Sequence, residues 1–478
     1  MTKPTLVYDV HEQPTLGKWI ILSLQHVLAM FGSTVLVPAI TGLPVSVTLV
    51  SAGLGTLLYI ILTNGKSPVF LGSSFAYISP ILTAMTIGVA TEGGKNPGAV
   101  AAGLMTVGII YLIIALIIKF LGTGWLNHIL PPIVIGPTII VIGLGLAPVA
   151  INMAQTNGTG TFDPKYLAVA LITLFTAIII SNFTKGLIQL IPIMIGIAVG
   201  YISAIMFGIV NFDILSQHNI IEMPEFLFLD GWPQFSFEVI AIMAPVALVT
   251  ISEHIGDHLV LSSIIGKDLT KNPGLARTIA GDGLATLTAG FLGGPANTTY
   301  GENTGVVGIT KVASVWVIGG AAVIAFFLGF IGKFTALITT IPAAVMGGVS
   351  ILLFGVIASS GARVLINNKI DFSKQRNLII AAVILVTGIG GMTIKIGNVE
   401  FAGMALAAIT GIVLHLILPN KDDSYGSKED VIKHIVVDGE LLVEEINNNK
   451  KMVITVDGTS DEKGVAKNIT SVNVVDKK

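Results

Sequence analysis

Apolar runs of about 20 residues recur from about residue 19 to residue 418 and constrain this chain more than any other feature. A helix needs about 20 apolar residues to cross a bilayer, and the runs amount to roughly fourteen such segments. Charged residues are only 11% of the 478 residues, whereas soluble domains carry about 25%. The sequence therefore predicts an all-α, multi-pass membrane protein, and so many spans favour a carrier or channel over a tethered enzyme.

Several classes of protein and site are disfavoured by composition. A net charge of −2 provides no basic field for nucleic acid. The absence of cysteine excludes disulfides and thiolate metal sites. Residues 1–17 are polar and lead into the first apolar run without a small-residue cleavage site, so no signal peptide is expected.

Two of the apolar segments are interrupted by polar residues. Residues 300–310 place a carboxylate, an amide and three glycines between apolar runs that end near Leu292 and begin near Val312. Residues 67–77 are similarly short and polar, and are expected to be extended chain leading into a half-helix near Ser79 and Pro80. Irregular polar backbone persists at membrane depth only where protein buries it or it lines a cavity, so both segments are candidates for a binding site.

Glu302 is the carboxylate of the first polar segment, and it has two interpretations. It could cap a half-helix beginning near Thr304, or it could accept hydrogen bonds from a ligand with N–H groups. The ligand interpretation is favoured because Asn303 and Thr304 can already act as caps. In the other polar segment, Ser74 and Phe75 would offer backbone donors or an aromatic face to a planar ligand, although Phe75 could equally be an ordinary core or lipid-facing residue.

A cluster of ionisable residues lies in the apolar run at about 239–265. Glu253 and Asp257 are four residues apart and share a helix face, and two carboxyl groups on a poorly solvated face cannot both stay ionised. The pair is a candidate proton site, although it could instead be structural, with Asp257 solvated near the membrane surface. His254 and His258 share a helix face, but no third metal ligand lies at a sequence spacing typical of a zinc site, so no metal is expected. His26, in the first run, could orient Glu253 or simply bond a backbone carbonyl.

An internal repeat relates the two polar segments. Gln25-His26 and Glu253-His254 are 228 residues apart, and the same offset relates Ser74 to Glu302. The sequence therefore predicts a duplication of about seven spans, and an odd number of spans inverts the second copy. Coincidence among low-complexity apolar segments is the alternative explanation.

Basic residues gather in the connections after the eighth and twelfth spans, the latter being expected at Thr335 to Ile357. Because cytoplasmic loops carry excess Lys and Arg, both termini are expected in the cytoplasm. The tail 420–478 is hydrophilic, with alternating runs such as 452–456, and could form a hairpin or stay disordered.

The polar motifs together resemble one family. Residues 297–306, with Gln25-His26, 68–80, 253–256 and 272–274, resemble in order the nucleobase-ascorbate transporter family, in its bacterial uracil permease branch. The resemblance covers about 19–418 and leaves out the tail. It implies fourteen spans in two inverted repeats of seven, with short antiparallel strands in spans three and ten. It also implies a cytoplasmic leader (1–18) and a cytoplasmic tail (420–478). Between them, the core domain would consist of residues 19–121, with spans 1–4, and residues 237–333, with spans 8–11. The gate domain would consist of residues 122–236, with spans 5–7 and a polar loop, and residues 334–419, with spans 12–14.

The resemblance also implies roles for the site residues. Glu253 and Glu302 would bond the ring edge of uracil, the backbone at Phe75 and Gly301 would donate to its carbonyl oxygens, and His26 would support the proton-sensitive Glu253. Ser74 and Asn303 complete the expected substrate site, and Asp257 stands where the family often has a histidine, which leaves open whether Asp257 or His258 senses the proton.

The expected function is proton-coupled import of uracil by alternating access, in a homodimer in the bacterial cytoplasmic membrane, with H⁺ as coupling ion and no cofactor. Uracil alternates N–H donors and carbonyl acceptors, which two carboxyl groups and backbone donors can satisfy. A carrier of another nucleobase, such as xanthine, is the first alternative. An anion carrier of related architecture is less favoured, because central carboxylates would repel its cargo.

Overall fold

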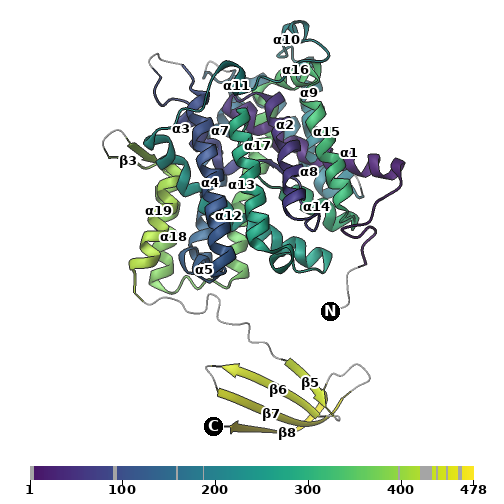
Figure 1. Ribbon diagram of the computed structural model, residues 1–478, viewed down its shortest axis with the longest axis vertical. Coiled ribbons are helices and arrows are strands. Elements are labelled where there is room, and N and C mark those ends of the chain that lie inside the picture. Colours follow the sequence, from purple (N-terminus) through teal and green to yellow (C-terminus); the bar gives the residue numbers. More distant parts are fainter. Residues whose placement is uncertain are drawn as a thin grey trace. The chain divides into compact units, whose positions relative to one another are not determined.

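The chain forms two units, a helical unit of Met1–Pro419 and a smaller unit of Asn420–Lys478 (Figure 1). The computed structural model describes residues 5–89, 94–157, 160–186, 188–396 and 399–419 of the first unit. In the second it describes residues 433–437, 440–447, 450–460 and 466–477.

Long apolar helices build the first unit. Within its described residues, seven helices are long and apolar enough to cross a membrane, or eight if one strongly bent pair counts as a single span, and four shorter apolar helices accompany them. The long ones are α1 (Leu16–Thr41), α2 (Val45–Leu62), α4 (Pro97–Leu121), α6 with α7 (Pro132–Gly145, Ala147–Gln155), α8 (Pro164–Phe183), α12 (Phe237–Ile265) and α17 (Ala343–Asn367). The protein is thus a multi-pass membrane protein, as predicted, while fourteen spans in inverted repeats stay a prediction.

The remaining helices of this unit are shorter or less apolar. They are α3 (Ile78–Ala84), α5 (Gly124–Ile129), α9 (Pro192–Met206), α10 (Asp213–Gln217), α11 (Leu227–Asp230), α13 (Leu275–Leu292), α14 (Gly301–Thr310), α15 (Val315–Leu328), α16 (Gly332–Thr339), α18 (Gln375–Ile389) and α19 (Gly403–Ile417). Single turns lie at η1 (Phe75–Tyr77), η2 (Ile188–Leu190) and η3 (Thr270–Gly274).

Two short strands lie inside the helical unit, one within residues 67–77, where extended chain was predicted, and the other directly before the polar segment 300–310. β1 (Leu71–Ser73) pairs antiparallel with β2 (Asn297–Thr299), with Leu71 opposite Thr299 and Ser73 opposite Asn297. Each strand leads into a short helix, β1 into η1 and α3, and β2 into α14. The predicted antiparallel strands are therefore confirmed.

The structural offset between the two strands differs slightly from the predicted one. The short helices begin at Phe75 and Gly301, an offset of 226 residues between positions 75 and 301 rather than 228. Phe75 therefore corresponds to Gly301, and Ser74 to Tyr300 rather than to Glu302. The half-helix expected near Thr304 begins three residues earlier, so Asn303 and Thr304 lie inside α14 instead of capping it.

One predicted span was misplaced. The expected span Thr335 to Ile357 is divided between α16 and α17, because the chain turns at 340–342 and Pro342 lies at the start of the second helix. Proline has no N–H to donate and its ring blocks a preceding helical turn, so it suits a helix start. α15 and α16, in turn, form the pair bent by 85°.

One buried apolar cluster joins helices from opposite halves of the sequence. Val35 and Leu36 of α1 lie in it with Val345 and Val349 of α17, and all four are almost fully buried. This cluster lies where the expected core and gate domains would meet.

The N-terminal segment is attached to the helical unit by backbone hydrogen bonds. Val7 donates to the carbonyl of Lys311, Ala313 donates to Tyr8, and Val315 donates to Val10. α10 and α11 lie at the opposite end of this unit from the N-terminus (Figure 1). The predicted sidedness of the termini is not tested by this arrangement.

Two further sheets complete the structure. β3 (Thr393–Ile396) and β4 (Val399–Ala402) form a hairpin between α18 and α19. The second unit is an antiparallel sheet in the order β5 (Lys433–Val437), β6 (Glu440–Asn447), β7 (Lys450–Ser460) and β8 (Ala466–Lys477). The alternating run 452–456 lies in β7, so the tail contains the strand pairing that its sequence allowed.

Candidate functional site

The ends of β1 and β2 turn two helix N-termini toward the middle of the helical unit. Phe75 and Gly301 are the first residues of η1 and α14, and the N–H groups of a first helical turn have no partner within the helix. Gly301 is exposed, and a Cβ added there would meet no atom within 4 Å. The start of α14 therefore has open space beside it, next to backbone N–H groups that have no partner within the helix.

Tyr300 fixes the two strands to each other and to α1. Its hydroxyl donates to the carbonyl of Ser73 at 3.0 Å and accepts from Thr34 of α1 at 3.2 Å. A Cβ added at Gly72 would lie 2.4 Å from the Tyr300 ring, so only glycine lets this ring pack against β1. The crossing of the strands is thus a rigid platform for the two helix starts.

Glu302 lies in the first turn of α14 and is held by α1. The Ser33 hydroxyl donates to its Oε1 atom. The Glu302 side chain is only half-buried, which leaves its second carboxylate oxygen able to accept a hydrogen bond from a ligand. Within the described residues Glu302 makes no capping hydrogen bond, although an acidic group in a first helical turn is favourably placed in the field of that helix. Its role as an acceptor for a ligand stays a prediction.

Asn303 connects α14 to His26. Its Nδ2 group donates to His26 Nδ1 at 3.1 Å and to the His26 carbonyl at 3.2 Å. Among the described residues, the buried Asn303 Oδ1 and Gln25 Nε2 atoms have no hydrogen-bond partner. His26 was expected to support Glu253, but it contacts Asn303 instead. The Gln25 amide keeps an unused donor, and the Asn303 amide keeps an unused acceptor.

Glu253 and Asp257 lie on one face of α12, and this face is only partly buried. Gly256, between them, is exposed and has open space beside it. The Glu253 carboxyl group lies close enough to those of Asp257 and Glu302 for their charges to interact. Asp257 accepts a hydrogen bond from the Thr299 hydroxyl of β2 at 2.8 Å. The structure therefore brings the two predicted glutamates together, and it joins Asp257 to the strand crossing rather than leaving it solvated.

Phe75 and Ser74 lie at the other edge of the crossing. The Phe75 ring meets Phe354 of α17 edge to face, with ring centroids 6.2 Å apart. Ser74 is buried and its backbone N–H donates to Ala296, which extends the β1–β2 ladder by one bond. Phe75 is half-buried and lies between the strand crossing and the expected gate domain.

The histidines that follow each carboxyl group point away from this face. His254 and His258 are fully buried and turn toward α13 and α2. His254 bonds Asp282 and Thr278, and His258 bonds Tyr59 and the His254 carbonyl. Asp282, Tyr59, Ser33, Thr299 and Tyr300 were not predicted as site residues.

Chemically, the site offers carboxylate acceptors from α12 and α14 and backbone N–H donors from the starts of η1 and α14. Such a set suits a small, flat, uncharged molecule with alternating donors and acceptors, because each of its polar edges finds a partner. A desolvated polar edge without a partner would weaken binding.

Comparison with known proteins assigns the chain to a family. The sequence profile described as the Permease family, that of the xanthine and uracil permeases, matches residues 17–397. The chain belongs to this family, the nucleobase-ascorbate transporters. This nucleobase-ascorbate transporter is therefore a membrane permease and not an enzyme.

Uracil permeases are among its relatives. This transporter is 51% identical over 424 residues to the uracil permease of Bacillus caldolyticus, with 88% of this chain and 96% of that protein covered. It is 52% identical over 427 residues to the uracil permease of Bacillus subtilis, covering 88% and 97%. The uracil permease of Escherichia coli is 44% identical over 411 residues, covering 85% and 93%.

Solved structures share its fold at low sequence identity. The transmembrane domain of the cyanobacterial bicarbonate transporter BicA matches 87% of this chain and all of that chain, with a TM-score of 0.59 and 15% identity. The inward-facing murine anion transporter Slc26a9 matches 85% of this chain and 68% of that chain, with a TM-score of 0.64 and 11% identity. These likenesses establish a membrane transporter fold.

Proposed function

We propose that this nucleobase-ascorbate transporter imports uracil together with protons by alternating access. The observation that carries the proposal is the electrostatic interaction between Glu253 of α12 and Glu302 of α14, together with the open space at the first residue of α14. The high identity to three uracil permeases supports the choice of substrate.

Uracil matches the polar groups around this space. Its ring carries two N–H donors and two carbonyl acceptors in alternation, and it is flat and uncharged. In the proposed complex, Glu253 and Glu302 accept from the two N–H groups, and the backbone N–H groups of Phe75 and Gly301 donate to the carbonyl oxygens. Ser74 and Asn303 border the ring, with the unpaired Asn303 Oδ1 as a further acceptor.

Proton coupling follows from the concentration of acidic groups. Glu253, Asp257 and Glu302 interact electrostatically in a weakly solvated place, and like charges there repel strongly. Binding of uracil removes more water and raises the cost of that repulsion, so uptake of a proton with the substrate relieves it. In this proposal Glu253 and Asp257 carry the transported proton, and His26 orients Asn303 beside them.

Alternating access would move the core domain, with residues 19–121 and 237–333, against the gate domain, with residues 122–236 and 334–419. The Phe75–Phe354 contact lies at this boundary and would separate or slide during the movement. We further propose that the protein lies in the bacterial cytoplasmic membrane as a homodimer, with both termini in the cytoplasm. H⁺ is its only coupling ion in this proposal, and no cofactor is needed.

Another nucleobase is the alternative substrate, because xanthine offers a similar uracil-like edge. An anion carrier is less well supported, although BicA and Slc26a9 share the fold. Three carboxyl groups that interact electrostatically would repel an anion.

Uptake of radiolabelled uracil into proteoliposomes with an imposed pH gradient tests the proposal. Glu253→Gln and Glu302→Gln keep the size of each side chain and remove the ionisable group. Each should lower uptake at least about tenfold, since losing a hydrogen bond to a charged partner costs about 1.5–3 kcal/mol. Glu238→Gln, at the start of the same helix α12, is the matched control and should transport normally. Normal transport by both site variants would refute the assignment, and competition by unlabelled xanthine but not uracil would favour the alternative.

A further inference from the structure

The helix that carries Glu302 has little tendency to form alone. α14 has ten residues, of which three are glycine and five are β-branched. Both kinds of residue favour a helix less than alanine does, and isolated helices this short are marginal even for better sequences. α14 therefore depends on contacts with the rest of the protein. Tyr300 holds its start against β1, so the contacts at its other end matter as well.

The N-terminal segment holds the end of α14. Val7 donates to the carbonyl of Lys311 at 2.8 Å, and Lys311 is the residue in left-handed conformation that ends the helix. Tyr8 lies opposite Val312 in a parallel β-bridge. Residues 7–10 thus run as a strand-like strip along the chain that leaves α14, and we call this strip the N-terminal clamp.

A buried valine of the N-terminal clamp packs with both helices that carry the proposed site glutamates. Val10 is 1% exposed. It belongs to one buried apolar cluster with Ile265 of α12 and Val307 of α14. The two helices approach each other closely here, since a Cβ added at Gly308 of α14 would lie 3.3 Å from the Ile264 side chain of α12. The clamp is therefore part of the packing between α12 and α14.

An ion pair attaches the N-terminal clamp to the end of α12. The Lys267 ammonium group donates to both carboxylate oxygens of Asp9, at 2.6 and 2.8 Å. Lys267 directly follows Gly266, which caps α12. The clamp is thus bonded to the ends of both helices, to α14 through its backbone and to α12 through the Asp9 side chain.

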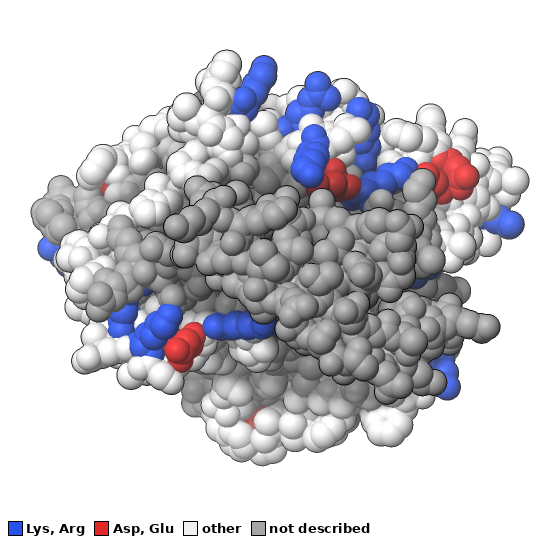
Figure 2. All heavy atoms as spheres, turned by 90° about the horizontal axis from the view of Figure 1, so that it is seen from below, with Lys and Arg blue, Asp and Glu red and all other residues white. Residues whose placement is uncertain are grey.

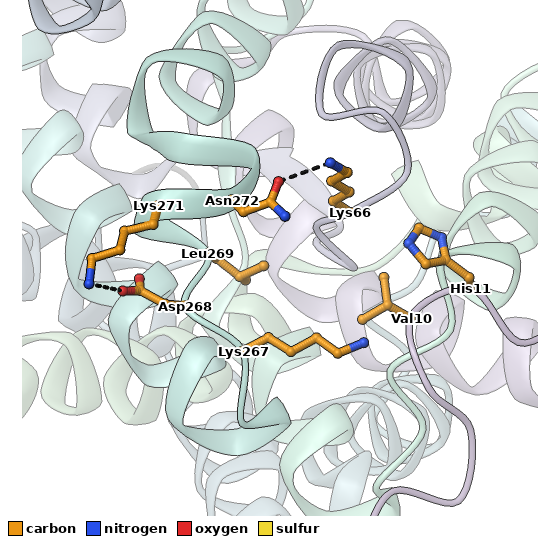
Figure 3. A pocket seen from close by; sticks show the side chains of 8 residues that line it. All are labelled: Val10, His11, Lys66, Lys267, Asp268, Leu269, Lys271 and Asn272. Atoms are coloured by element: carbon orange, nitrogen blue, oxygen red, sulfur yellow. Dashed lines mark hydrogen bonds and ion pairs between the residues drawn. The ribbon is translucent and has the colours of Figure 1, made fainter. Parts of the chain in front are cut away.

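Open space lies beside the N-terminal clamp, in a pocket of about 480 Å³ (Figure 3). Val10 and His11 line one side of it, whereas Lys66 and Asn272 line another and are joined by a hydrogen bond of 2.9 Å. Three lysines and one aspartate are among the lining residues, and Lys and Arg side chains gather along the visible rim in the view from below (Figure 2). Basic surroundings attract the Asp9 carboxylate. Detachment of the clamp would leave the contact across the pocket in place.

We propose that the N-terminal clamp keeps α14 formed and packed against α12, and that Val10 and Asp9 are thereby positioning residues for uracil binding. Release of the clamp lowers the fraction of the protein in which α14 is ready to bind, and the apparent affinity falls with that fraction. The proposal rests on the proposed function, because it takes the glutamates of α12 and α14 as the uracil site.

The N-terminal clamp acts on these glutamates from a distance. Lys267 lies 14 residues after Glu253, roughly 20 Å along α12. Lys311 lies nine residues after Glu302, roughly 13 Å along α14. Variants of the clamp can therefore change uracil binding without removing any group that bonds the ligand.

Equilibrium binding of radiolabelled uracil to the purified protein separates positioning from folding. The dissociation constant reports how well the folded protein binds, whereas the number of binding sites reports how much protein is folded. Val10→Ala removes two buried carbons, each worth about fourfold in an equilibrium constant, so uracil should bind about three- to 15-fold more weakly. Asp9→Asn should weaken binding about two- to fivefold, the scale of an exposed ion pair. The number of sites should not change.

Each variant has a matched control. Val100 of α4 is also 1% exposed, and Val100→Ala makes the same substitution away from the N-terminal clamp. Asp268→Asn breaks another ion pair of the connection after α12, the one with Lys271. Both controls should bind uracil with the affinity of the wild type.

A disulfide across the N-terminal clamp makes the test reversible, because the chain contains no cysteine. Tyr8→Cys with Val312→Cys places two thiols on the bridged pair, and neighbouring strands lie within the reach of a disulfide. When Val10→Ala is added to this pair, oxidation should restore the affinity lost by Val10→Ala. Reduction should lower the affinity again.

Four results would overturn the N-terminal clamp. Unchanged affinity in both Val10→Ala and Asp9→Asn, with normal binding by the wild type, would refute the clamp alone, as would a disulfide that restores nothing. Fewer sites at an unchanged dissociation constant, or an equal loss of affinity in Val100→Ala, would leave Val10 with a role in folding only. A wild-type protein that binds no uracil would overturn the proposed function, and the clamp with it.

Discussion

The hydrogen bond from Ser33 to Glu302 allows a sharp test of the substrate site. Ser33→Ala removes this donor from a fully buried position on α1 and leaves the Glu302 carboxylate free to rotate. A hydrogen bond to a charged group contributes about 1.5–3 kcal/mol. If that energy holds Glu302 in its uracil-binding orientation, its loss should weaken uracil binding about 10- to 150-fold.

Equilibrium binding of radiolabelled uracil to purified protein measures this effect directly. Ser23→Ala is the matched control, because Ser23 is also a fully buried serine of α1 but donates to the carbonyl of Val317 on α15. Ser23→Ala should bind uracil as the wild type does. Unchanged binding in Ser33→Ala, or an equal loss in both variants, would refute the role assigned to Ser33.

Two further predictions concern the strand crossing and the N-terminal segment. Gly72→Ala would force a Cβ to 2.4 Å from the Tyr300 ring and should destabilise the protein by about 1–3 kcal/mol, seen as a lower unfolding temperature in detergent. Gly124→Ala, with nothing within 4 Å, should unfold like the wild type, and equal unfolding temperatures for the two variants would contradict the packing argument. Lys267 donates to both oxygens of Asp9 and holds the pKa of that carboxyl below its ordinary value of 3.8. Because both side chains are half-exposed, Asp9→Asn should cost at most about 1 kcal/mol of stability above pH 3.8. This difference should vanish as the pH falls through the lowered pKa, and a difference that grows on acidification would reverse the assigned sign.

The sequence predicted the fold class for physical reasons that act locally, whereas the pair of antiparallel strands was implied by the family resemblance. Long apolar runs leave few options but membrane helices, and the polar segments around Ser73 and Thr299 can exist at that depth only where protein buries them or they line a cavity. Glu253 and Glu302 were found because carboxyl groups are costly inside a membrane and rarely lack a role there.

The partners of these residues could not be predicted in the same way. Ser33, Thr299 and Tyr300 are ordinary residues in a membrane helix or strand, and their roles arise from contacts with elements more than 40 residues away. His26 was paired with Glu253 because both are ionisable, whereas the packing of α14 against α1 places Asn303 beside it. Pro342 did give a local signal for the break between α16 and α17, but the apolar residues on both sides concealed it.

The position of a bound nucleobase tests the central claim most directly. An experimental structure with 5-bromouracil would locate the ligand by the anomalous scattering of its bromine. We predict a ring between Glu253 of α12 and Glu302 of α14, within hydrogen-bond distance of both carboxyl groups and of the Gly301 backbone. A bromine site in the pocket beside Lys66, or anywhere out of reach of both glutamates, would contradict the account.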